Sequence, residues 1–237
     1  NPLGAIGTYV EVLRRRGADA EVTAGMTREL ERVDRIVRGL LDYARSHDDT
    51  PLPINAPQIL QSAVDLLRAQ GAFHNVPLAL DITADVPAIM GQAHVLEQAL
   101  VNLLLNAIDA TEAMGSDGCI LIGARRWAYQ PGLALPKRAS DSSSISFNRR
   151  PERRPARMEF AAGEIGALIF VTDSGPGVAK EDRERVFEPF FTTKAAGRGT
   201  GLGLAIVARA VHEMGGVIWV DTAREGGAAF KLFFPAA

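Results

Sequence analysis

The order of helical and strand-like stretches after residue 57 is the feature that most constrains the fold of this chain. Apolar residues at helical spacing predict helices over about 57–70, 94–113 and 203–215. Short apolar runs predict strands at 76–83, 86–90, 119–127, 165–171, 217–222 and 228–234. Because these stretches mix without a regular βαβ repeat, the pattern favours the α+β class over a doubly wound fold. We expect an α/β sandwich in which a mixed sheet carries helices on one face.

The first part of the chain predicts a helical hairpin over residues 1–46. Its second helix places one apolar stripe at Leu30, Val33, Val37, Leu40 and Ala44. Two helices with one stripe each bury it poorly alone, so we expect dimerisation of two hairpins into a four-helix bundle. Packing of the hairpin onto its own downstream domain is the alternative, and periodicity does not separate the two. The polar, proline-containing residues 47–56 predict a linker before a second domain at 57–237.

Composition excludes several classes of protein. The 237 residues carry a net charge of −2, so nothing global attracts the chain to nucleic acid or to an anionic membrane. The one cysteine, Cys119, excludes an internal disulfide framework and is interpreted as a small buried core residue. No apolar run approaches the roughly 18 residues that would cross a bilayer.

Two glycine-rich stretches contain candidate ligand-binding residues. In VTDSGPGV (171–178), Asp173 ends a predicted strand, and Gly175 and Gly177 let the backbone approach a ligand closely. A carboxylate there can accept a hydrogen bond from an exocyclic amine such as that of adenine, although a simple Asp-Gly turn is the alternative. In GRGTGLGLAIV (197–207), four glycines lead into a helix whose terminus can bind phosphate. Its spacing fits neither a P-loop nor a dinucleotide-binding motif.

Two asparagines within the predicted helix 94–113 are candidates for a metal site. Asn102 and Asn106 lie one turn apart on the same face of an otherwise apolar helix. An amide oxygen is a neutral ligand that suits a Mg²⁺ ion retaining most of its waters and its substrate phosphates. The alternative is that both amides only cap neighbouring backbone groups.

Four motifs in this order resemble those of one family. NLLLNA, DSGPG, FEPFFTTK and GTGLGLAIV look like the N, G1, F and G2 boxes of the sensor histidine kinases. These kinases share their ATP-binding fold with gyrase, a heat-shock chaperone and the mismatch-repair ATPases. The resemblance extends over residues 57–237 and is greatest to the nitrogen-regulation and dicarboxylate-sensing branch.

The resemblance implies that ATP and Mg²⁺ are the cofactors. Asp173 would bind the adenine amino group, Asn106 would hold Mg²⁺, and Asn102 would support the phosphates. Lys194 would meet the β- or γ-phosphate. The other residues implied to bind the nucleotide are Gly175, Gly177, Thr193, Gly199, Thr200, Gly201, Leu202 and Gly203. A mobile lid would span residues 179–200, anchored to the core by Phe187, Phe190 and Phe191.

The residue at position 102 bears on the reaction. The ATP-hydrolysing relatives carry a glutamate four residues before the Mg²⁺ asparagine, whereas Asn102 cannot act as a general base. The resemblance therefore implies phosphoryl transfer to a protein side chain. An ATP-driven conformational clamp and an interaction module without nucleotide binding are the two rival functions.

The opening residues NPL match the end of the family's hairpin motif, H-[ED]-x-x-N-P-L. This implies a phosphoacceptor histidine four residues before Asn1, and a role for Asn1 in dephosphorylating a response regulator. We therefore expect the sequence as given to bind Mg·ATP without phosphorylating itself. The implied partners are a receiver domain and a second copy of the chain, but no nucleic acid. The implied location is cytoplasmic, with membrane attachment only through an upstream sensor region.

Residues 125–159 depart from the family pattern, which joins the flanking strands by a short turn. The segment holds nine basic residues against three acidic ones. We expect an accessory insertion, either a solvated loop or a docking surface for an acidic partner.

Overall fold

The computed structural model describes most of the chain. The described residues are 2–27, 30, 33, 50–74, 76–112, 114, 118–130, 160–194, 199–223 and 226–237. The predictions on Asn1, on three of the stripe residues (Val37, Leu40 and Ala44) and on the basic residues after 130 lie outside this part.

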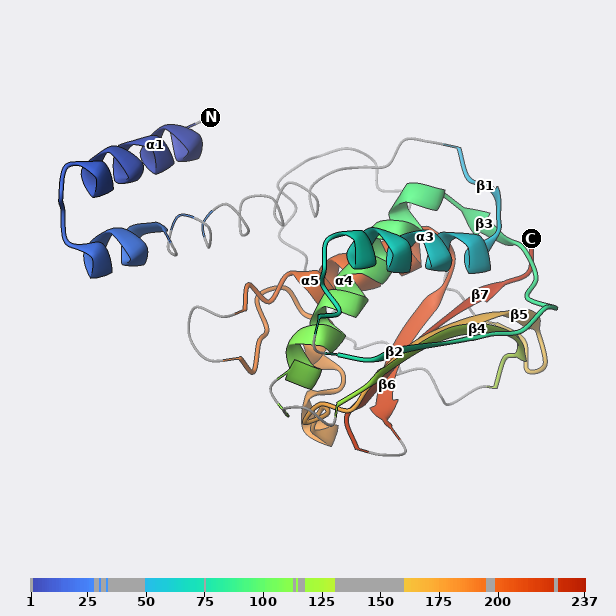
Figure 1. Ribbon diagram of the computed structural model, residues 1–237. Coiled ribbons are helices and arrows are strands. Elements are labelled where there is room, and N and C mark those ends of the chain that lie inside the picture. The colour runs from blue at the N-terminus through green and yellow to red at the C-terminus, as the bar shows by residue number, and fades with distance from the viewer. Residues whose placement is uncertain are drawn as a thin grey trace, which may run out of the picture.

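The N-terminal segment contains two helical stretches joined by a tight turn (Figure 1). Helix α1 spans Pro2–Arg15, and residues 20–27 are again helical. The second stretch begins where it does because Asp19 Oδ1 accepts hydrogen bonds from the backbone N–H groups of Glu21 and Val22, at 2.8 and 3.1 Å. Apolar side chains remain exposed along both stretches: Ile6, Tyr9, Val12, Leu13, Val22 and Met26.

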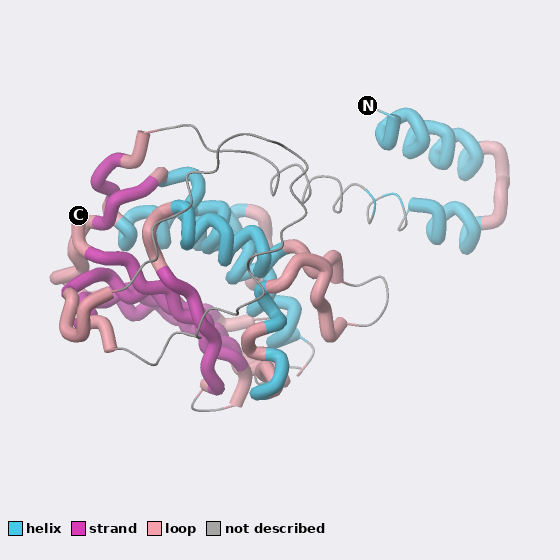
Figure 2. Tube along the Cα trace, turned by 180° about the vertical axis from the view of Figure 1, so that it is seen from behind, coloured by secondary structure: helices cyan, strands magenta, loops and turns pink. Residues whose placement is uncertain are grey.

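The downstream residues build a five-stranded mixed sheet in the order β2-β4-β5-β7-β6. Figure 2 shows its strands in magenta beside the cyan helices. Its strands are β2 (Leu78–Ile82), β4 (Ile120–Ala128), β5 (Ile165–Asp173), β6 (Val217–Thr222) and β7 (Ala228–Pro235). The β2–β4 pair is parallel and the other pairs are antiparallel. Strand β5 is therefore the central strand of the sheet.

Three helices cover one face of this sheet (Figure 1). They are α3 (Ala56–Ala69), α4 (Ala93–Glu112) and α5 (Gly203–Glu213). The main apolar core lies between them and the sheet, with fully buried leucines at 100, 103 and 104 of α4. The predicted α+β sandwich is confirmed. None of the helices in the described part of the chain has the length and hydropathy needed to cross a membrane.

The opposite face of the sheet carries a smaller apolar cluster around Leu168, Trp219 and Phe233. Leu168 belongs to this cluster while its strand neighbours Ala167 and Ile169 belong to the main core, because successive side chains of a strand alternate between faces. Phe233 supports an edge-to-face aromatic contact, with its ring centroid 5.2 Å from that of Phe160.

A short strand lies where the sequence predicts only a linker. Strand β1 (Leu52–Ile54) pairs antiparallel with β3 (Ile89–Gly91) in a separate two-stranded sheet. Prolines at 51 and 53 suggest an extended linker, but an edge strand tolerates a proline because one side of its backbone needs no partner. The linker prediction is therefore wrong for residues 52–54.

Two further expectations are corrected. Cys119 is exposed and not a core residue, because it lies just before β4 at the end of the sheet. Arg125 and Arg126 lie within β4 and so are not part of a loop insertion. Arg125 pairs with Asp81 of β2 at 3.0 Å and stacks over the Phe170 ring, 4.6 Å from its centroid.

Helix α4 offers a direct test of the core. Replacing the fully buried Leu103 with Ala should lower the free energy of unfolding by about 2–5 kcal/mol, because it leaves a cavity under the sheet. Leu105→Ala on the exposed side of the same helix is the matched control and should change it by only about 0.5 kcal/mol. Urea denaturation measures both, and equal losses would contradict the placement of α4.

Candidate functional site

The central strand β5 ends in a buried carboxylate. Asp173 is only 4% exposed. Its Oδ1 atom accepts hydrogen bonds from the backbone N–H groups of Gly175, at 2.9 Å, and Ala228, at 3.1 Å. Oδ2 accepts no hydrogen bond from the described residues. One oxygen is thus fixed by the protein, and the other remains available to a donor from a ligand.

Burial raises the pKa of the Asp173 carboxyl above its ordinary value, while the two backbone hydrogen bonds act in the opposite direction. Removal of a carboxylate from water disfavours its charged form. A hydrogen-bond donor at Oδ2 would stabilise the ionised form, so binding of such a ligand and ionisation of Asp173 favour each other.

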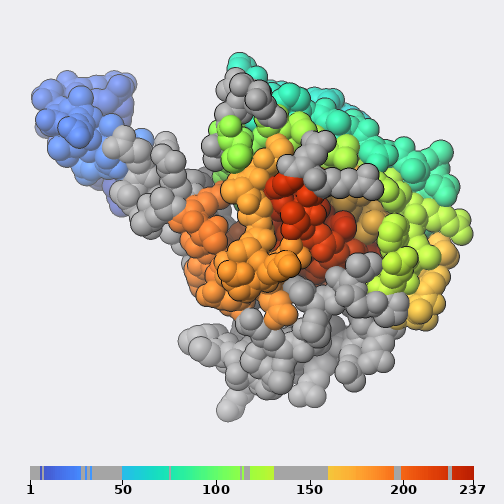
Figure 3. Space-filling model, turned by 90° about the horizontal axis from the view of Figure 1, so that it is seen from below, coloured from blue at the N-terminus to red at the C-terminus, as the bar shows by residue number. Residues whose placement is uncertain are grey.

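The loop after Asp173 fits tightly between α4 and the turn before β7. A Cβ on Gly175 would lie 2.7 Å from the Ala110 Cβ of α4. Gly177 has φ of 76°, and a Cβ there would lie 2.9 Å from the carbonyl oxygen of Gly227. Figure 3 shows this segment (orange) against the C-terminal residues (red). The requirement for glycine at 177 is therefore both conformational and steric.

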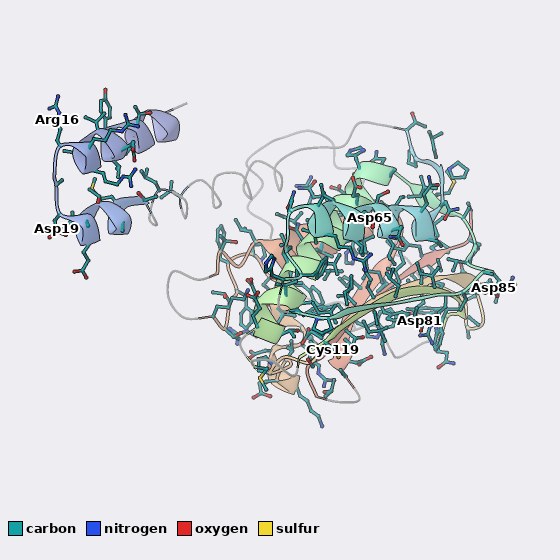
Figure 4. All side chains as sticks on the ribbon, viewed as in Figure 1. Arg16, Asp19, Asp65, Asp81, Asp85 and Cys119 are labelled. Atoms are coloured by element: carbon teal, nitrogen blue, oxygen red, sulfur yellow. The ribbon has the colours of Figure 1, made fainter. Side chains whose placement is uncertain are left out.

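Ser174 ties this loop to the start of β4. Its Oγ accepts a hydrogen bond from the Cys119 backbone N–H at 2.8 Å, and its own N–H donates to the Cys119 carbonyl at 3.2 Å. The label of Cys119 in Figure 4 marks this end of the sheet. The sequence gives no role to Ser174, since its partner is 55 residues away.

The two asparagines of α4, Asn102 and Asn106, are half-buried. Neither the Asn102 nor the Asn106 amide forms a hydrogen bond with any described residue, so the structure offers no support for a backbone-capping role. The Asn106 Nδ2 atom would lie 3.6 Å from a Cβ on Gly203, the first residue of α5. The Asn106 amide therefore lies at the N-terminus of α5.

The N-terminus of α5 has the properties of an anion site. Its N-cap residue, Leu202, provides no side-chain cap, and the first turn contains no acidic residue. Thr200 Oγ1 accepts a hydrogen bond from the Leu202 N–H at 3.3 Å, which fixes the preceding loop. Backbone N–H groups and the helix dipole at such a terminus attract phosphate.

The segment before this loop contacts the core of the domain through a few apolar side chains. Phe187 and Phe191 pack against the main core, and the Phe187 ring lies 6.3 Å from that of Phe230, edge to face. Phe190 does not anchor the segment as predicted, because its side chain is 63% exposed. Residues 180–182 and 185–187 form short 3-10 turns. The lid over residues 179–200 stays a prediction.

The backbone of Phe190 meets the glycine loop. Its N–H donates to the carbonyl of Gly201 at 2.9 Å, and its φ of 68° is in the left-handed region. Gly201 has φ of 65°, and a Cβ there would collide with the Phe190 backbone. This close approach fixes where the glycine loop lies.

Lys194 also lies beside the glycine loop. A Cβ on Gly199 would lie 3.4 Å from the Lys194 Cβ and 2.5 Å from Thr192 Oγ1. The Lys194 ammonium forms an ion pair with Asp109 of α4, at 2.6 Å. The sequence suggests no role for Asp109, although its place three residues after Asn106 could have indicated one. Thr193 is exposed.

Together these residues form two neighbouring subsites along α4. Ala110 contacts the Asp173 loop, while Asn106 and Asp109 face α5 and Lys194. The first subsite can accept a hydrogen bond, and the second can hold an anion. The described residues contain no group of three or more His, Cys, Asp or Glu able to hold a metal. The donors present fit a Mg²⁺ ion that takes most of its ligands from water and phosphate.

Comparison with known proteins gives one family and many relatives. Residues 91–237 match the family described as "Histidine kinase-, DNA gyrase B-, and HSP90-like ATPase". Sensor histidine kinase ZraS of Salmonella typhi is 28% identical over 99% of this chain and 43% of its own length. Two-component sensor PprA of Pseudomonas aeruginosa is 33% identical over 100% of this chain and 21% of its own length. The chain spans less than half the length of these relatives.

Solved structures share the fold over the whole chain. Full-length ShkA in complex with AMPPNP has a TM-score of 0.64 at 24% identity, covering 100% of this chain and 44% of that one. Histidine kinase ThkA in complex with the response regulator protein TrrA has a TM-score of 0.63 at 22% identity, covering 100% of this chain and 58% of that one.

The contact between Gly201 and Phe190 gives a stability test. Gly201→Ala and Gly163→Ala both place a side chain at positive φ, but only position 201 lacks space for it. Gly163→Ala should lower the free energy of unfolding by about 1–2 kcal/mol, and Gly201→Ala by at least about 1 kcal/mol more. Chemical denaturation measures both, and equal losses would contradict the close approach.

Proposed function

The chain belongs to the family of histidine kinase-, DNA gyrase B- and HSP90-like ATPases, and on this premise we propose that it is the catalytic core of a sensor histidine kinase. It would bind Mg·ATP and transfer the γ-phosphoryl group to a histidine of a protein. The buried carboxylate of Asp173, with one oxygen held by backbone N–H groups and the other available, is the observation that carries this proposal.

Asp173 would recognise the adenine ring. The exocyclic amine of adenine donates to a carboxylate oxygen, and Oδ2 is the oxygen that the protein leaves without a donor among the described residues. Gly175 and Gly177 would form the wall beside the base, since both lie against neighbouring backbone or Cβ atoms with no room for a side chain.

The second subsite would bind the phosphates. Gly199, Thr200, Gly201 and Gly203 would present backbone N–H groups at the start of α5, with Leu202, Thr193 and Lys194 beside them. Asn106 would contribute an amide oxygen to Mg²⁺, and Asn102 would support the phosphate side.

Removal of Mg²⁺ should weaken the binding of a non-hydrolysable ATP analogue, and unchanged affinity in EDTA would exclude this metal role.

The proposed reaction is phosphoryl transfer and not rapid hydrolysis. A histidine ring nitrogen would form a bond to the γ-phosphorus while the bond to the bridging oxygen breaks and ADP leaves. Lys194 would offset the charge that develops on the phosphate oxygens. Asn102 cannot accept a proton from water, which disfavours the ATP-driven clamp as the second candidate. Rapid release of inorganic phosphate from ATP would favour the clamp instead.

The acceptor and partners follow from the same family. We propose that the acceptor is the histidine expected four residues before Asn1, that Asn1 assists dephosphorylation, and that the sequence as given does not phosphorylate itself. The phosphoryl group would then pass to an aspartate of a receiver domain, in a cytoplasmic reaction. Radiolabelled ATP tests this, since an acid-labile phosphohistidine on the sequence as given would exclude the proposed acceptor.

The hairpin of residues 1–46, followed by a linker up to residue 51, would provide the dimer contact. The exposed apolar side chains of α1 and of residues 20–27 support this role, because exposed apolar patches mark interaction surfaces. Sedimentation velocity of the chain and of residues 50–237 tests it. A dimer that forms only with the hairpin is expected, and a monomer in both cases would contradict it.

The adenine contact gives a direct prediction. Asp173→Asn should weaken binding of the ATP analogue by at least about tenfold, because a hydrogen bond to a charged group contributes about 1.5–3 kcal/mol. Asp221→Asn is the matched control, since Asp221 accepts hydrogen bonds from Trp219 and Lys231 on the face of the sheet that carries the smaller apolar cluster, and it should bind normally. Isothermal calorimetry measures both variants. Equal affinity in the wild type and Asp173→Asn would contradict the adenine role.

A further inference from the structure

One ion pair joins helix α4 to the segment that precedes the glycine loop, on the phosphate side of the proposed site. The Lys194 Nζ atom lies 2.6 Å from Asp109 Oδ2, across 85 residues of sequence. Both side chains are partly open to solvent, with 36% of Lys194 and 57% of Asp109 exposed. An exposed pair of this kind contributes only about 0–1 kcal/mol to stability, so the fold does not depend on it.

The pair lies where a terminal phosphate would enter. Asp109 follows Asn106 by three residues, so both side chains lie on one side of α4. Asn106 lies at the start of α5. The Lys194 backbone N–H donates to Thr192 Oγ1 at 3.2 Å, and Gly199 packs against both residues. The lysine is therefore held at its backbone by Thr192 and at its ammonium by Asp109.

We propose that Asp109 is a positioning residue, which holds the Lys194 ammonium beside Asn106 for the β- and γ-phosphates of the nucleotide. This inference rests on the proposed function. An ammonium group has three N–H donors, so Lys194 can donate to Asp109 and to a phosphate oxygen at the same time. The ion pair is retained in the nucleotide complex. Asp109 does not contact the phosphate and acts on it only by positioning Lys194.

The expected effect follows from the freedom of the lysine side chain. Without Asp109, Lys194 moves freely before binding and must become ordered on binding. Ordering one flexible side chain costs about 0.5–1.5 kcal/mol, which corresponds to a loss of affinity of about 2- to 13-fold. Removal of the Asp109 charge also reduces its repulsion of the phosphates, which raises the affinity for the nucleotide. A double-mutant cycle therefore has to isolate the part of the affinity change that depends on Lys194.

The experiment measures Mg²⁺-dependent binding of a non-hydrolysable ATP analogue to the wild type, Asp109→Asn, Lys194→Met and the double variant. Asp109→Asn should weaken binding by about 2- to 13-fold in the wild type but should produce no loss in the Lys194→Met background. Asp109→Glu should restore most of the affinity, because it keeps the carboxylate. AMP, which lacks the β- and γ-phosphates, should bind all variants equally.

Asp81→Asn is the matched control. Asp81 forms a similarly exposed ion pair with Arg125, at 3.0 Å, and Figure 4 labels it on β2, away from Cys119 at the site end of the sheet. This variant should bind the analogue as the wild type does. Thermal denaturation of each variant verifies that the chain is folded.

Two results would overturn the inference while leaving the proposed function intact. One is unchanged or tighter binding by Asp109→Asn, as expected if Asp109 competes with the phosphate for Lys194. The other is an equal loss with and without Lys194. Absence of nucleotide binding by the wild type would instead remove the proposed function, and the inference with it.

Discussion

The carboxylate of Asp173 is the group on which the site depends. It is buried at the end of the central strand, where two backbone N–H groups hold Oδ1. Those donors come from the loop after β5 and from the start of β7, so the sheet must form before the carboxylate is held. Burial of this group without a donor to Oδ2 is unfavourable, and a ligand that donates there relieves part of the cost.

Helix α4 connects this carboxylate to the proposed phosphate subsite. Its buried leucines fix the helix on the sheet, and its polar residues Asn102, Asn106 and Asp109 remain partly exposed on another side. A helix that is well packed on one side holds polar groups on another in a fixed geometry, which a loop does not do. In the glycine loop, Gly199 lies beside the Lys194 side chain. At the start of α5, Gly203 lies beside the Asn106 amide.

Sequence patterns predicted the sheet, the three covering helices and the α+β class, because periodicity reports which side of an element is buried. They missed β1, whose prolines suggest a linker, and placed Cys119 in the core on residue type alone. They also assigned Phe190 to the core, although this residue is exposed and has a positive φ. The Lys194–Asp109 and Ser174–Cys119 contacts join distant segments, and no local pattern reports such pairs.

The measurement that tests the central claim most directly compares Mg²⁺ complexes of non-hydrolysable ATP and GTP analogues by calorimetry on the wild-type chain. In the proposed site, adenine would present an amine to Asp173, whereas guanine would present a carbonyl oxygen at the same position, and two acceptors repel. The ATP analogue should bind at least about tenfold more tightly, the value of one charge-assisted hydrogen bond. Equal affinity for both, or tighter binding of the GTP analogue, would contradict the role of Asp173 in adenine recognition.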